Sequence, residues 1–133
     1  MDLSHVVADD YHDRSLGELV TAPLTALRGM TPDAAERLRD AFKIESVGAL
    51  GKHILFRFAQ AMVIMGGVKN DAVHSDWGDR PLRDALDQPP TVITYLTAEQ
   101  ASALESALGI TTLKEMGTHP LFLRAQALLT LSE

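Results

Sequence analysis

The sequence has no cysteine among its 133 residues, which excludes disulfide bonds, thiol catalysis and cysteine-ligated metal or iron–sulfur sites. It also lacks a long apolar run. The most apolar stretch, 54–68, is interrupted by Arg57 and Gln60 and is too short and too polar to cross a bilayer. The first ten residues are acidic and carry no basic or apolar leader. We therefore expect a cytoplasmic protein with no membrane partner.

An excess of positive charge is missing as well. Lys and Arg total 12 against 18 Asp and Glu, a net charge of −6, which argues against a general binder of nucleic acids or anionic membranes. No Gly-x-Ser-x-Gly, His-Glu-x-x-His, Walker or dinucleotide-binding motif occurs. The length suits one domain or two very small ones and excludes a barrel or doubly wound enzyme. We expect no enzymatic activity and no cofactor.

What the sequence does contain is an internal duplication. Shifted by 66 residues, the chain matches itself without a gap at nineteen identical positions, where this composition would give about five by chance. The best run aligns Leu55–Ala61 with Leu121–Ala127. The duplication covers the whole chain, so we predict two copies, 1–66 and 67–133, related by a pseudo-twofold axis. The alternative is that both copies share one compact domain.

Capping signals place the helices of each copy. Hydroxyl residues precede five candidate helices, several with an acid or amide three residues later: Ser15, Thr31, Ser46, Thr97 and Thr112. The longer helices should end near Phe42 and Leu108, and a last helix should follow in each copy, over 54–65 and 120–131. Pro81 should open a short helix equivalent to the one capped by Ser15. No segment alternates as a strand would, so the predicted fold is all-α.

Glycines mark the turns between these helices. Gly109 can supply the left-handed residue that ends a helix, whereas Lys43, its counterpart, must adopt that conformation at some cost. Gly51 and Gly117 should stop the short third helix of each copy. The segment 66–71, which begins Gly-Gly, is the predicted linker between copies.

The unit of helix, turn with a buried Ile, and helix, at 31–50 and 97–116, resembles the helix-hairpin-helix. The order of helices over about 66 residues is similar to the C-terminal domain of the bacterial RNA polymerase α subunit, and Gly-Ile-Thr-Thr-Leu at 109–113 carries most of this likeness. The resemblance implies either sequence-independent DNA binding through hairpin N–H groups and nearby bases, or packing against proteins. The DNA-binding form has glycine on both sides of the buried residue; the first copy has neither and the second only one.

Basic residues gather around the first hairpin. Residues 28–57 hold six bases and four acids, a local net charge of +2. The candidate residues for binding a phosphate or an acidic partner are Arg37, Arg39, Lys43, Lys52 and Arg57. The competing interpretation, which we favour, is a solvated helix with ion pairs along its own surface, such as Glu36 with Arg39.

Histidines offer a third possibility. His5, Asp9 and His12 have i, i+4, i+7 spacing and would share one face of a helix, where they could hold Zn²⁺. The second copy lacks this set, and we favour a solvated segment. His53 and His119 occupy equivalent positions, and we expect each to pack against its own turn and bond a backbone group.

Apolar residues of the last helix of the first copy have a similar double interpretation. Phe56, Phe58, Met62 and Met65 either pack in the core, which we favour, or form a Met/Phe binding groove.

The function we predict is a non-enzymatic protein-interaction or scaffold module, binding another protein or itself. The alternatives are weak nucleic-acid binding through the basic hairpin, and small-ligand or metal binding through the N-terminal histidines.

Overall fold

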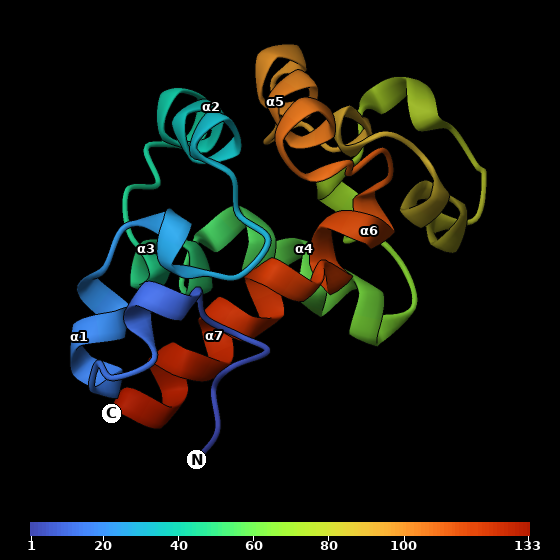
Figure 1. The fold of residues 1–133 in the computed structure, drawn as a ribbon. Helices are drawn as coiled ribbons and strands as arrows, with labels where there is room; N and C mark the ends of the chain where they lie inside the picture. Colours follow the sequence, from blue (N-terminus) through green and yellow to red (C-terminus); the bar gives the residue numbers. More distant parts are fainter. The chain divides into compact units, whose positions relative to one another are not determined.

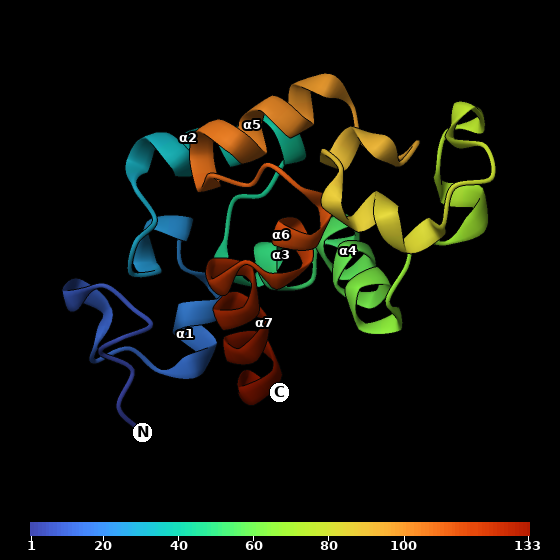
Figure 2. The same cartoon turned by 90° about the vertical axis from the view of Figure 1, so that its right-hand side faces the viewer.

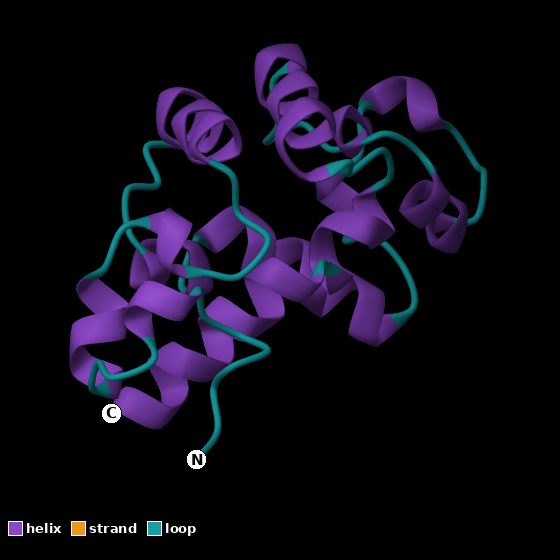
Figure 3. Cartoon of the chain, in the orientation of Figure 1, coloured by secondary structure: helices purple, strands orange, loops and turns teal.

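The computed structural model describes residues 1–133 and confirms the all-α fold: helices and turns, with no strand (Figure 3). Six short 3-10 segments accompany seven α-helices. The α-helices are α1 (Leu16–Thr21), α2 (Pro32–Phe42), α3 (Val47–Gly51), α4 (Ile54–Met65), α5 (Ala98–Leu108), α6 (Leu113–Thr118) and α7 (Pro120–Ser132). Each copy contains one isolated antiparallel bridge, and the two bridges occupy equivalent positions: Val7 with Leu27, and Val73 with Ile93.

Side-chain caps begin the helices as the sequence predicted. Ser15 forms a capping box with Glu18, and Thr97 forms one with Gln100, so the first free N–H groups of α1 and α5 are satisfied. The helices α2 and α5 are each followed by a left-handed residue, Lys43 with φ 62° and Gly109 with φ 68°. The buried Ile of each hairpin follows directly after that residue.

The chain forms two compact units whose boundaries differ from those of the sequence copies. Unit 1 consists of residues 1–53 and 120–133, and unit 2 of residues 54–119. The last helix of each copy therefore belongs to the unit that holds the rest of the other copy. The chain passes between units twice, at the His53–Ile54 and His119–Pro120 bonds.

In unit 1, α7 packs against α1 and α3. Figure 1 shows α7 in red beside the blue α1, and Figure 2 shows the same pair after rotation. The backbones of α3 and α7 approach closely at Gly51, where an added Cβ would lie 2.7 Å from the carbonyl oxygen of Ala125. Phe122 of α7 is fully buried in this unit. Glycine is required at position 51 because no side chain fits there.

Unit 2 repeats this arrangement with the equivalent residues. There α4 packs against α6, and a Cβ added at Gly117 would lie 2.6 Å from the backbone carbonyl carbon of Ala59. Phe56 of α4 is fully buried, as Phe122 is in unit 1. Ala59 and Ala125 are 66 residues apart, as are Gly51 and Gly117, so the duplicated residues make the same contact in each unit. The pseudo-twofold relation between the copies stays a prediction.

The structure refines several local predictions. Gly51 is the last residue of α3, where we predicted the helix to end, and Gly117 is the last but one of α6. Both glycines also allow close helix packing, which we did not predict. The segment after Pro81 forms a 3-10 helix, Leu82–Asp87, instead of the α-helix found in the first copy. The N-terminal lead contains only one 3-10 turn, Asp9–Tyr11, so His5, Asp9 and His12 do not share the face of a helix that their spacing would allow.

The stretch Val47–Met65 is, by length and composition alone, apolar enough to cross a membrane. The core helices of globular proteins also pass this test. Here the stretch is divided into α3 and α4, and both helices bury side chains in the protein core, for example Leu50 and Phe56.

Candidate interaction grooves

Exposed apolar side chains are concentrated on two helices. Seven large hydrophobic side chains are exposed, and five of them lie on α4 or α7: Ile54, Ile64, Met65, Leu123 and Leu131. Met65 is 82% exposed and Ile64 is 75% exposed. The positions of Met65 and Leu131 are equivalent in the two copies. Clustered apolar exposure on the same helix of each copy is typical of a binding surface, unlike single exposed residues scattered over the protein.

In unit 2, the exposed end of α4 borders an open groove of about 510 Å³, which we call the α4 groove. Its lining comes from α4, the turn that follows it, and the 3-10 helix Leu82–Asp87. The lining residues are Phe58, Ala61, Met62, Met65, Gly66, Gly67, Val68, Lys69, Leu82 and Arg83. Phe58 also meets the ring of Tyr95 edge-on, with centroids 5.5 Å apart, and Tyr95 is 48% exposed.

The turn after α4 shapes this groove. Gly66 has φ 78°. The N–H of Gly66 donates to the carbonyl oxygen of Val63, and the N–H of Gly67 donates to the carbonyl oxygen of Met62. This is the Schellman pattern of helix termination. It turns the chain so that Val68, whose N–H donates to the Leu82 carbonyl oxygen at 3.2 Å, closes one side of the groove.

Unit 1 has a smaller groove of about 270 Å³ along α7, the α7 groove. It is lined by Leu3, His5, Val6, Leu123, Arg124, Ala127, Leu128 and Leu131. Four of these, at 124, 127, 128 and 131, are the equivalents of Phe58, Ala61, Met62 and Met65. The same four helix positions thus line an apolar groove in each unit, although only one of the four residue types is the same.

The structure resolves the two interpretations of the apolar residues of α4. Phe56 and Met62 are buried, which confirms core packing for them. Phe58 and Met65 line the groove, as does one edge of Met62. Ile64, Leu131, Lys69 and Arg83 were not among the residues predicted from the sequence. A usable signal was the presence of apolar residues such as Ile64 and Met65 outside the buried face of α4, since packing one face requires only an apolar stripe.

Four of the basic residues predicted as a binding set lie in unit 1, and Arg57 lies in unit 2. On α2, Arg37 Nε lies 2.9 Å from Asp33 Oδ2, and Arg39 pairs with Glu36 and Asp40. These pairs match the favoured interpretation of a solvated helix, and they reduce the positive charge that a phosphate would meet. Nucleic-acid binding stays a prediction.

The hairpin backbone differs between the copies. In the second, the N–H groups of Thr111 and Thr112 donate to Glu115 Oε1 at 2.9 and 3.0 Å. Hydrogen bonds from Thr111, first from its hydroxyl and next from its N–H, lower the pKa of Glu115. This carboxylate occupies the donors that a bound phosphate would use. The first copy has Ala49 at the equivalent position, but Glu45 adds an acid to its turn.

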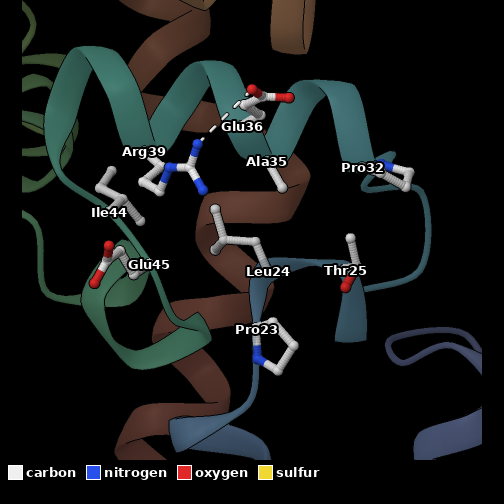
Figure 4. A pocket seen from close by; sticks show the side chains of 9 residues that line it. All are labelled: Pro23, Leu24, Thr25, Pro32, Ala35, Glu36, Arg39, Ile44 and Glu45. Carbon is white, nitrogen blue, oxygen red and sulfur yellow. Dashed lines mark ion pairs between the residues drawn. The ribbon is translucent and has the colours of Figure 1, made fainter.

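A pocket of about 510 Å³ lies beside the first hairpin (Figure 4). It is lined by Pro23, Leu24, Thr25, Pro32, Ala35, Glu36, Arg39, Ile44 and Glu45. In Figure 4 the guanidinium of Arg39 points toward Glu36, and the two groups are 3.8 Å apart. One base among two acids gives no net attraction for an anion, and no histidine lines the pocket. It supports neither a phosphate site nor a catalytic set.

The histidines adopt two different roles. Asp9 is held by Arg28, His12 Nε2 lies 3.6 Å from Asp9 Oδ1, and His5 lines the α7 groove. No group of three or more metal-binding side chains forms in the chain, and metal binding by His5, Asp9 and His12 stays the less favoured alternative.

His53 and His119 confirm the prediction of a structural role. His119 Nε2 lies 3.1 Å from the Leu108 carbonyl oxygen, and His53 has a hydrogen bond with the equivalent backbone of Phe42. Burial lowers the pKa of both imidazoles and is only partly opposed by these hydrogen bonds.

Comparison of the chain with protein families, curated proteins and solved structures gives no match.

Proposed function

We propose that this chain is a non-enzymatic protein-interaction module that binds a partner through the α4 and α7 grooves. One observation carries the proposal: equivalent positions on the last helix of each copy line an open apolar groove, in each unit separately. Met65 and Leu131 are exposed to water. Full burial of a side chain of this size is worth about 1.5–3 kcal/mol of free energy, which the isolated chain does not gain. A partner that covers them recovers this free energy.

Two grooves in one chain also fit a scaffold. Each unit carries one groove, so a partner with two apolar segments would bind with higher avidity than either groove alone provides. The composition around the α4 groove is that of an interface core, with aromatic, methionine and arginine side chains and no acid in the lining.

The test is selection of peptides from a random displayed library on the full chain. We expect enriched peptides to bind wild type and to lose binding on Met65→Asp, Leu131→Asp, or both. Because both side chains are exposed, circular dichroism and the melting temperature should remain those of wild type. Failure to enrich any peptide that depends on either residue would refute the proposal.

Size exclusion with light scattering extends this test. A concentration-dependent dimer that Met65→Asp or Leu131→Asp dissolves would identify a second copy as the partner. Retention of short duplex DNA at low salt, lost on Lys43→Glu with Lys52→Glu, would instead favour the nucleic-acid alternative.

A further inference from the structure

We propose that the α4 groove binds an amphipathic helix with acidic flanks, an inference that depends on the proposed interaction function. The shape of the groove supports a helical occupant. Phe58, Ala61, Met62 and Met65 follow i, i+3, i+4, i+7 spacing along α4, so the apolar floor extends over about 10 Å, two helical turns. An apolar stripe of the same length and spacing lies on one face of a partner helix.

The groove also accommodates a close contact with partners of different apolar shape. Gly66 and Gly67 line it without side chains, and a Cβ at Gly66 would meet no atom within 4 Å. A partner helix can therefore approach the backbone at this end. Methionine side chains adapt to different apolar shapes, and Met65 is free to do so because it is 82% exposed.

The charged residues of the groove favour an acidic partner. The chain has a net charge of −6, yet the charged residues in the lining of the α4 groove are both basic, Lys69 and Arg83. Their own ion pairs are loose and exposed: 3.5 Å from Lys69 Nζ to Asp71 and 3.9 Å from Arg83 Nε to Asp84. Such pairs are weak, so a partner carboxylate can replace them. Arg57, one turn before Ala61 on α4, is exposed and has no ion pair.

These observations favour acids on both sides of the partner's apolar stripe. A neutral helix could fill the floor but would leave Lys69 and Arg83 with only their weak exposed ion pairs, and a basic helix would be repelled by both. The α7 groove is smaller and has Arg124 and His5 in its lining, so the same preference should be weaker there.

The experiment uses the full chain and two synthetic helical peptides that share one leucine stripe and differ only in flanking Glu or Lys. We expect the Glu peptide to bind roughly tenfold more tightly at low ionic strength, with the difference shrinking as salt is added. Met65→Asp should abolish this binding. Arg83→Glu should remove most of the preference, whereas Lys114→Glu, the same charge change in unit 2 outside the groove, should keep it.

Three results would overturn the inference: equal binding of both peptides, a preference that persists in Arg83→Glu, or stronger Met65-dependent binding to vesicles of anionic phospholipid than to the Glu peptide. The proposed function can survive this failure. Neutral or basic peptides selected from the random library that still require Met65 would retain the interaction module and reject only the acidic partner. Absence of any Met65- or Leu131-dependent peptide would reject both.

Discussion

At the scale of single residues, one methyl group is enough to disturb either unit. A Cβ at Gly51 or Gly117 would meet backbone atoms of Ala125 or Ala59 at 2.7 Å or less, and backbone cannot move aside as a side chain does. We expect Gly51→Ala and Gly117→Ala each to lower the free energy of unfolding by about 1–3 kcal/mol, as overpacking does.

The matched control is Gly17→Ala. Gly17 lies in α1, and an added Cβ would meet only Ser15 Oγ at 4.0 Å. Alanine there should raise the free energy of unfolding by about 0.5–1 kcal/mol through helix propensity. Urea denaturation measures all three variants, and destabilisation by Gly17→Ala equal to the others would contradict the packing argument.

The two structural histidines make a prediction about pH. Burial lowers the pKa of His53 and His119 in the folded state below the ordinary 6.5, so the unfolded chain binds more protons just below that pH. Stability should therefore be complete above pH 6.5 and fall as the pH decreases from 6.5 toward the folded-state values. Thermal melts of wild type should show this fall, and His53→Gln with His119→Gln should flatten it. A slope unchanged in the double variant would assign it to other groups.

At the scale of elements, side-chain hydroxyl groups cap and stabilise the N-terminal ends of the short helices. Thr112 Oγ1 accepts the N–H of Glu115 at 3.1 Å and begins α6, which has only six residues. Thr112→Ala should lower the free energy of unfolding by about 0.5–2 kcal/mol. Thr130→Ala, on the exposed side of α7, should change it by less than about 0.5 kcal/mol. Equal effects in urea denaturation would show that the cap contributes nothing.

Elements were also the level at which the sequence predicted the structure best. Local signals such as the Thr31 cap and the left-handed Lys43 depend on a few neighbouring residues, and they placed α2 correctly. The role of Gly51 could not be predicted, because it depends on Ala125, far along the chain. The α4 groove was predicted only in part: Phe58 and Met65 were candidates, whereas Arg83 comes from a 3-10 helix whose position depends on tertiary packing.

At the scale of the whole molecule, the exchange of last helices between copies predicts which unit is destabilised by a substitution in α4 or α7. Phe122 belongs to the second copy by sequence but is buried in unit 1, and Phe56 of the first copy is buried in unit 2. Phe→Ala in a core costs about 3–5 kcal/mol. Hydrogen exchange should therefore accelerate in α1 and α3 for Phe122→Ala, and in α6 for Phe56→Ala. The reverse pattern would show that each last helix packs within its own copy.

The same exchange has a consequence for biosynthesis. A ribosome releases residues 1–53 first, but unit 1 lacks α7 until residues 120–133 have emerged, after the whole of unit 2. Unit 2 is continuous in sequence, so all of its residues are synthesised before unit 1 is complete. Residues 1–53 are therefore synthesised well before their unit is complete. Until α7 has been synthesised, the surface on which it packs stays exposed. During that interval, α4 of the first copy can pack on this surface in place of α7, because the buried faces of the two helices have similar sequences.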